Sequence, residues 1–173
     1  RFANVNGTGS ASANNLIMKS IFRMGVPVTG KNYFPSNIQG LPTWYEIRAS
    51  KDGYLARGDA VDLMVAMNVE TYARDVREVA PGGFLIYDST WPRSSLLSRD
   101  DITVLGVPFA RLCNENFDGV RNRILMKNIC YAGALAALLD IDFEVIRGLV
   151  TEQYAAKPKL VDANMKAIEL GYR

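Results

Sequence analysis

The chain has 173 residues, of which 49% are apolar and 22% charged, proportions typical of one compact domain with a buried core. Its net charge of +2, with no run of Lys and Arg, argues against the basic face of a nucleic-acid-binding domain. The longest apolar run, residues 131–139, is about half the length needed to cross a bilayer, and no amino-terminal segment resembles a signal peptide. We therefore expect a cytoplasmic protein, one domain over residues 1–173, with neither a nucleic-acid nor a membrane partner.

Two residue types restrict the chemistry of the chain. It contains no histidine, which excludes catalytic triads, proton shuttles and metal sites built on imidazole when the chain acts alone. Cys113 and Cys130 are its two thiols, too few for a four-thiolate iron–sulfur cluster or a zinc knuckle. We expect both cysteines to be small apolar core residues rather than a disulfide, and we predict no metal site.

The hydrophobic pattern alternates strands with helices along the chain. Strands are predicted, in chain order, at residues 2–5, 26–29, 43–50, 54–57, 61–67, 84–88 and 102–107. Helices are predicted at residues 12–24, 72–79, 124–139, 143–154 and 158–170. This alternation indicates parallel pairing, whereas Lys51-Asp52-Gly53 between two of the strands is typical of an antiparallel hairpin. The predicted fold is α/β, a three-layer α/β/α arrangement with a mixed, mostly parallel sheet and a helical carboxy-terminal part.

Several boundaries depend on single residues. The first strand begins abruptly, as though residues before Arg1 belonged to it, so we expect the chain to be part of a longer subunit. Gly25 is placed to end the first helix, and Pro158 suits the first turn of the last helix. Gly171 suits the carboxy-terminal cap of that helix. Residues 81–83, Pro-Gly-Gly, are expected to turn the chain into the strand at residues 84–88.

The turn Asn6-Gly7-Thr8-Gly9-Ser10-Ala11-Ser12 is the most informative motif. It joins a strand to a helix, so its unpaired backbone N–H groups suit an anion, and no acidic residue precedes Glu46. A dinucleotide fingerprint is disfavoured, because its third glycine is replaced by Ser12 and no acidic residue ends the second strand. An NADP site would depend on Lys31 alone, and the Gly-Lys-Ser/Thr of a Walker loop is missing. Either the turn holds an anion, or its glycines let it pass close to a neighbouring segment.

Residues 33–48 form a second candidate segment, a loop that leads into a strand. Two prolines and a glycine restrict its backbone, while Ser36, Asn37 and Gln39 can donate and accept hydrogen bonds. Structured polar loops often bind ligands. The alternative is a connection whose amides satisfy its own backbone.

Together these motifs resemble the gamma domain of the 2-oxoacid:ferredoxin oxidoreductases over nearly the whole chain. The resemblance rests on the glycine turn, on Tyr-x-Pro-Ser at residues 33–36 leading to Gly40-x-Pro42, and on Ile47-Arg48-x-Ser50. Later landmarks agree in order and spacing: Asp62-Leu63, Ala66, Asn68, Pro81-Gly82-Gly83, Asn128, Gly133, Lys157, Asn164 and Gly171. The chain is most similar to the form in which this domain is the amino-terminal part of an alpha subunit, of the 2-oxoglutarate or pyruvate type.

Two departures from the family pattern fall within the candidate segments. The family turn is usually richer in glycine and contains a glutamine, where this chain has residues 10–13, Ser-Ala-Ser-Ala. The family loop commonly reads Arg-Gly-Gly, where this chain has Gln39-Gly40-Leu41.

The resemblance implies a share in a multi-subunit enzyme that oxidatively decarboxylates a 2-oxoacid of the 2-oxoglutarate or pyruvate class. It implies that the acyl group leaves on coenzyme A and that electrons pass to ferredoxin. Thiamine diphosphate, magnesium and the iron–sulfur cluster would be held by other domains of the subunit and by a thiamine diphosphate-binding beta subunit. The resemblance therefore implies that this chain supplies no catalytic residue, binds no cofactor alone and is inactive in isolation.

Our hypothesis from the sequence is that the turn and the loop face an inter-domain cleft and help to hold coenzyme A. The predicted cofactor-binding residues are Gly7, Thr8, Gly9, Ser10, Lys31, Ser36, Asn37, Gln39, Gly40 and Arg48. Lys31 and Arg48 would supply positive charge, unless Arg48 pairs with Glu46 or a surface carboxylate. Two alternatives stay open: a structural interface domain of the same complex, and a stand-alone NAD(P)-binding oxidoreductase.

Overall fold

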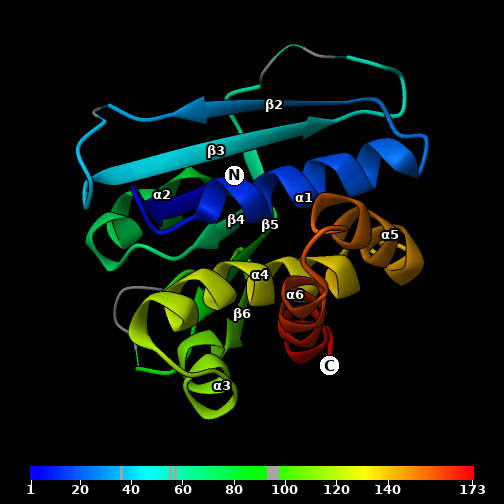
Figure 1. Ribbon diagram of the computed structural model, residues 1–173. Coiled ribbons are helices and arrows are strands. Elements are labelled where there is room, and N and C mark those ends of the chain that lie inside the picture. Colours follow the sequence, from blue (N-terminus) through cyan, green and yellow to red (C-terminus); the bar gives the residue numbers. More distant parts are fainter. Residues whose placement is uncertain (36, 55, 57, 93–97) are drawn as a thin grey trace.

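The computed structural model describes residues 1–35, 37–54, 56, 58–92 and 98–173 (Figure 1). The strands are β1 (Phe2–Val5), β2 (Val28–Tyr33), β3 (Pro42–Ala49), β4 (Val61–Ala66), β5 (Val79–Asp88) and β6 (Thr103–Val107). The helices are α1 (Ser10–Arg23), α2 (Tyr72–Glu78), α3 (Phe109–Asn116), α4 (Val120–Leu138), α5 (Phe143–Gln153) and α6 (Pro158–Tyr172). A short 3-10 turn, Val69–Thr71, precedes α2.

The strands form one six-stranded sheet in the order β2-β3-β1-β4-β5-β6. The pairs β1–β4, β4–β5 and β5–β6 are parallel, whereas β1–β3 and β2–β3 are antiparallel. The predicted α/β class, with a mixed and mostly parallel sheet, is confirmed.

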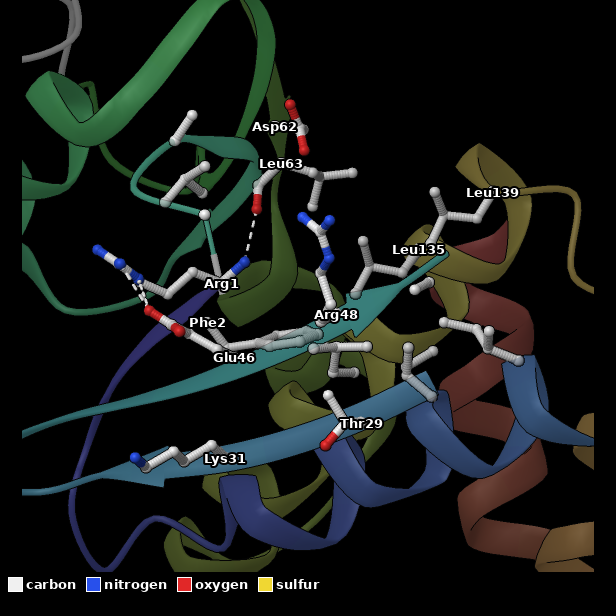
Figure 2. Close-up of a pocket in the computed structure, with 17 residues that line it drawn as sticks. Arg1, Phe2, Thr29, Lys31, Glu46, Arg48, Asp62, Leu63, Leu135 and Leu139 are labelled. Carbon is white, nitrogen blue, oxygen red and sulfur yellow. Dashed lines mark hydrogen bonds and ion pairs between the residues drawn. The ribbon is translucent and has the colours of Figure 1, made fainter. Parts of the chain in front are cut away.

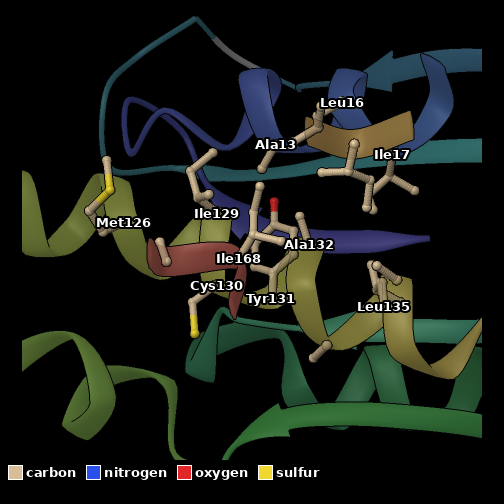
Figure 3. Close-up of a cluster of buried hydrophobic side chains, with 14 of the residues drawn as sticks. Ala13, Leu16, Ile17, Met126, Ile129, Cys130, Tyr131, Ala132, Leu135 and Ile168 are labelled. Atoms are coloured by element: carbon tan, nitrogen blue, oxygen red, sulfur yellow. The ribbon is translucent and has the colours of Figure 1, made fainter. Parts of the chain in front are cut away.

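Helices cover both faces of the sheet, which gives the three predicted layers. On one face, α1 and α3 to α6 bury a large cluster that includes Ile17, Tyr131 and Ile168 (Figure 3). On the other face, α2 contributes Tyr72 to a smaller cluster. Side chains of a strand alternate between the two faces, so β1 places Phe2 in the larger cluster and the next residue in the smaller one. Full burial of an apolar side chain of this size contributes roughly 1.5–3 kcal/mol to stability.

The hairpin predicted around Lys51-Asp52-Gly53 is wrong. The three residues do form a turn, with Gly53 at φ 76°, but the described residues 54 and 56 belong to no strand, and residues 55 and 57 lie outside the described part. β3 pairs with β2 along one edge and with β1 along the other, and among the described residues no strand after the turn pairs with it. The antiparallel hairpin of this fold is β2–β3, which the loop at residues 34–41 connects.

Two glycine predictions also differ from the structure. Gly171 does not cap α6, because the helix continues to Tyr172. A Cβ atom at Gly171 would lie 1.8 Å from the carbonyl oxygen of Cys130, so this glycine lets α6 approach α4 closely.

The Pro-Gly-Gly segment at residues 81–83 lies inside β5 instead of preceding a strand. There the pairing with β4 shifts register and Gly82 has φ 78°, which is typical of a β-bulge. Helix α3 was not predicted.

Candidate functional site

The candidate site lies at the edge of the sheet where the parallel strands β1 and β4 end. At β1 the strand order reverses, because the chain goes from β1 to β2 and β3 on one side and returns to β4 on the other. In open α/β sheets, ligands usually bind at such a switch point, beyond the carboxyl ends of the strands. The turn at residues 6–9 follows β1 directly and lies at this point.

The turn has the backbone conformation that its glycines allow. Gly7 and Gly9 have φ values of 86° and 82°. Thr8 holds the turn against β1, because its hydroxyl donates to the carbonyl oxygen of Val5 at 2.8 Å. Helix α1 then begins at Ser10 with no side-chain cap and no acidic residue in its first turn. An uncapped helix start with this charge pattern suits an anion.

A buried polar network that was not predicted from the sequence supports the turn. The side-chain amide of Asn128, on α4, donates to the carbonyl oxygen of Thr8 at 2.8 Å and accepts a hydrogen bond from Asn4 at 3.3 Å. Nearby, the hydroxyl of Tyr131 donates to Asn14 at 2.7 Å. The signal in the sequence is asparagine, a poor helix former, on the otherwise apolar faces of two helices.

The structure joins the loop at residues 34–41 to the turn. The backbone N–H of Asn6 donates to Leu41 at 2.8 Å, and the N–H of Gly40 donates back to Asn6 at 3.0 Å. The side chain of Gln39 covers Gly7 so closely that a Cβ atom at Gly7 would lie 2.6 Å from its Cγ. The predicted site residue Gly7 therefore lies beside Gln39 and Gly40, although more than 30 positions separate it from them in the chain.

A cavity of about 240 Å³ lies beside the turn, on the side of β2 and β3. It is lined by Gly7, Gly9, Ser10 and Asn14 from the turn and α1, and by Asn32 and Trp44 from the strands, among others. The predicted residue Asn37 is exposed on the loop, and Ser36 lies outside the described residues. The turn and part of the loop thus form one continuous surface beside this cavity.

Lys31 and Arg48 line a different cavity, at the start of β1 (Figure 2). The ammonium of Lys31 lies 5.1 Å from the centre of the Tyr33 ring. We expected Glu46 or a surface carboxylate as alternative partners of Arg48, and neither forms an ion pair with it within the described part of the chain. Glu46 accepts a hydrogen bond from Nε of Arg1 at 2.6 Å. Lys31 and Arg48 therefore do not line the cavity beside the turn, which we call the turn cavity.

Burial shifts the pKa values of ionisable groups within the core. Burial raises the pKa of Asp75, which accepts a hydrogen bond from the indole N–H of Trp44 at 3.0 Å. Cys113 and Cys130 are both free and buried, as predicted, and contact with Cys113 together with burial raises the pKa of the Cys130 thiol. Among the described residues, no group of three or more Cys, Asp or Glu side chains is arranged to hold a metal ion.

Comparison with known proteins assigns the family. The sequence profile described as "Pyruvate ferredoxin/flavodoxin oxidoreductase" matches residues 1–173, the entire chain. The chain belongs to this oxidoreductase family. The resemblance derived from the sequence motifs is thereby confirmed.

Curated relatives in the family are longer than this chain. The alpha subunit of 2-oxoacid:ferredoxin oxidoreductase 2 from Aeropyrum pernix is 22% identical, and the alignment covers 95% of this chain but 31% of that subunit. Ketoisovalerate oxidoreductase subunit VorA from Methanothermobacter thermautotrophicus is 27% identical over 65% of this chain and 22% of its own length. The chain thus spans less than a third of these relatives.

Solved structures share the fold. A 2-oxoglutarate:ferredoxin oxidoreductase from Magnetococcus marinus, with 2-oxoglutarate, coenzyme A and succinyl-CoA bound, superposes with a TM-score of 0.85 at 23% identity, over 98% of this chain and 29% of that one. The gamma subunit of a keto/oxoacid ferredoxin oxidoreductase from Geobacter sulfurreducens has a TM-score of 0.74 at 18% identity, over 99% of this chain and 94% of the subunit. The same fold therefore occurs both as a separate gamma subunit and as part of a longer chain in this family.

The lengths and polarity of the helices show whether one of them could span a membrane. In the ranges that the structure describes, each helix is too short or too polar to cross a bilayer.

Proposed function

We propose that this chain is the gamma domain of a 2-oxoacid:ferredoxin oxidoreductase, and that the surface formed by its turn and loop is one wall of a coenzyme A site completed by another domain. The whole enzyme would convert a 2-oxoacid of the 2-oxoglutarate or pyruvate class to an acyl-coenzyme A and pass electrons to ferredoxin. The observation that carries this proposal is the hydrogen-bonded junction of residues 6–9 with residues 38–41 at the switch point of the sheet.

The residues on this surface fit a phosphate-bearing ligand. The first turn of α1 offers backbone N–H groups without a side-chain cap, and the helix has no acidic residue there. Gly7, Thr8, Gly9 and Ser10 would hold phosphate through these backbone groups, while Asn37 and Gln39 are exposed amides that can meet an amide or pyrophosphate group. Bound coenzyme A would supply the thiol that accepts the acyl group. What the chain itself contributes is binding and orientation.

Lys31 is retained as the cation of the proposed surface. It directly precedes Asn32 in β2, and Asn32 lines the turn cavity. Its side chain is exposed, so it is accessible to a ligand. Arg48 lines the same cavity as Lys31, but it is half-buried and its Nε is not exposed, so it is no longer included.

The remaining cofactors do not fit this chain and are assigned to partners. Its two thiols are buried in the helical layer and cannot supply the four thiolates of a cluster. We therefore place the iron–sulfur cluster, thiamine diphosphate and magnesium in other domains and in a beta subunit.

Titration of the intact complex with coenzyme A tests the proposal. Gln39→Ala and Lys31→Ala should each weaken coenzyme A binding by roughly two- to tenfold, the effect of losing one hydrogen bond or charge contact. Lys51→Ala is the matched control, because Lys51 is exposed and lies beyond the far end of β3 from the loop. Unchanged affinity in both test variants would contradict the proposed ligand role.

One observation favours the alternative of a purely structural interface domain. Ile38 and Leu41, which flank the junction, are 61% and 39% exposed, and exposed apolar residues of this kind often lie against another protein surface. Under this alternative, the phosphates of coenzyme A in a complex structure would contact other domains alone. The NAD(P) alternative gains no such support, since β2 carries no acidic side chain.

A further inference from the structure

The turn cavity is lined by uncharged polar side chains. They come from the strands and from the beginning of α1: Asn4, Ser10, Asn14, Asn32 and Thr43. Among the described residues, no Asp, Glu, Lys or Arg side chain lines it. The cavity therefore offers hydrogen bonds without a formal charge.

The strand side chains in this lining point to the face of the sheet that α1 covers. In the pair β1–β3, Phe2 is opposite Tyr45, and Asn4 is opposite Thr43. Phe2 packs in the larger core cluster, and strand residues two positions apart point to the same face, so Asn4 and Thr43 point to that side as well. Phe2 and Tyr45 also line the cavity, which adds an apolar part to its wall.

Two buried side chains of α1 leave hydrogen-bonding groups unused beside the cavity. Asn14 is 2% exposed, and its Oδ1 accepts from the hydroxyl of Tyr131 at 2.7 Å, but its Nδ2 has no hydrogen-bond partner among the described residues. Ser10, one helical turn earlier on the same face, is 8% exposed, and its hydroxyl makes no hydrogen bond to a described residue. Burial of a polar group without a partner is unfavourable, so these groups indicate an occupant that hydrogen-bonds to them.

The size of the cavity indicates more than one buried water. Its volume is about 240 Å³, whereas one water takes roughly 30 Å³ in the liquid. The occupant that fits this lining has several polar atoms, no charge and an apolar portion.

Coenzyme A contains a segment of this chemistry. Its pantetheine arm carries amide, hydroxyl and methylene groups without a charge, and it is joined to the phosphates of the nucleotide half. Asn14 and Ser10 can hydrogen-bond to such amides, and Phe2 and Tyr45 can contact the methylene groups. Phosphate, in contrast, fits the uncapped backbone N–H groups at the start of α1, next to the cavity.

We propose that the turn cavity binds the pantetheine arm of coenzyme A through the side chains of Ser10 and Asn14. The inference rests on the proposed function and adds which part of the ligand enters the cavity. The nucleotide half stays outside the cavity, at the backbone of the turn and beside Gln39 and Lys31. Recognition of the uncharged arm then depends on the buried side chains of α1.

Competition against coenzyme A in the intact complex tests this assignment with the two halves of the ligand. S-methylpantetheine represents the arm and cannot accept an acyl group, because its thiol is blocked. Adenosine 3′,5′-bisphosphate represents the nucleotide half. Asn14→Leu and Ser10→Ala should each raise the inhibition constant of S-methylpantetheine roughly three- to tenfold, the effect of losing one hydrogen bond, and leave that of the bisphosphate within about twofold.

Tyr131→Phe is the matched structural control. It removes the hydroxyl that donates to Asn14 but keeps both α1 side chains in place. This variant should lower the melting temperature and leave both inhibition constants within about twofold. Ser10→Ala keeps the test decisive if Asn14→Leu does not fold, because it removes a single oxygen atom.

The outcomes separate this inference from the proposed function. If S-methylpantetheine does not compete with coenzyme A, or if neither α1 variant changes its inhibition constant, the inference is wrong. Equal weakening of both halves, or an equal effect of Tyr131→Phe, also overturns it, because general damage to the site would have that result. If Gln39→Ala and Lys31→Ala leave the affinity for coenzyme A unchanged as well, the proposed function fails too.

Discussion

At the residue scale, buried polar side chains decide the shape of the candidate site. Asn128 is fully buried, yet its amide both donates to Thr8 and accepts from Asn4. An unsatisfied amide at this depth would cost about 1–3 kcal/mol, so the pairing of these groups stabilises one conformation of the turn. The backbone N–H groups proposed to meet phosphate are thus oriented before any ligand binds.

The amino group of Arg1 predicts how the stability of the 173-residue chain depends on pH. Its pKa falls from 8.0 in the unfolded chain to about 5 in the folded one, so between these values the unfolded state binds more protons. The free energy of unfolding should therefore rise from pH 5 to pH 8, by at most about 4 kcal/mol for a shift of this size.

Urea unfolding at pH 5, 6.5 and 8 measures this effect. The control is the same chain with an acetylated amino terminus, which cannot be protonated there, so the difference between the two proteins isolates this group from Asp75 and other carboxylates. A difference that does not change with pH would contradict the prediction.

At the element scale, glycines set how closely α4 and α6 pack. A Cβ atom at Gly133 would lie 2.0 Å from the carbonyl oxygen of Ile168, and Gly171 meets the backbone of Cys130 in the same way. These contacts are between backbones, which cannot rotate away as a flexible side chain can. The helix–helix interface therefore depends on the absence of side chains at these positions.

Gly133→Ala should destabilise the protein by roughly 1–3 kcal/mol, because α4 and α6 must move apart. Gly148→Ala is the matched control: Gly148 is also helical, in α5, but a Cβ there would meet nothing within 4 Å. This control should be neutral or stabilise by up to about 1 kcal/mol, since alanine favours the helix. Similar unfolding midpoints for the two variants would show that the close contact is unimportant.

Much of the fold could be predicted at this scale because helices and strands have local signals. The strand at residues 2–5 has the predicted bounds, and the four longest helices were all placed within a few residues. The hairpin was misplaced because Lys51-Asp52-Gly53 signals a turn and says nothing about which edge of β3 is free. Gly171 was misassigned because a capping glycine and a contact glycine look alike until the crossing helix is known.

At the scale of the whole molecule, the topology separates the predicted site residues into two groups. The two ends of β1 carry different surfaces, the turn and loop at one end and the cavity lined by Arg48 at the other. The sequence placed Gly7 beside Gln39 correctly in a shared surface, but it also assigned Arg48 to that surface. β3 connects the two ends, so residues a few positions apart in the sequence contribute to different cavities.

Calorimetry can test the remaining alternative function on the 173-residue chain. We expect no heat of binding with NAD or NADP at millimolar concentration, because β2 has no acidic residue to bind the ribose hydroxyls and the turn lacks its third glycine. Saturable binding of either nucleotide would instead favour a stand-alone oxidoreductase.

The sequence by itself determined the α/β class, the acid-free glycine turn, the exclusion of imidazole chemistry and the family, because periodicity, composition and motif spacing are local properties of the chain. Only the tertiary structure decided which segments meet. It joined Gln39 to Gly7, placed Asn128 beneath Thr8, and separated Arg48 from both. The physical reason is that strand order and helix crossing set these contacts, and both depend on which surfaces bury each other when the chain folds.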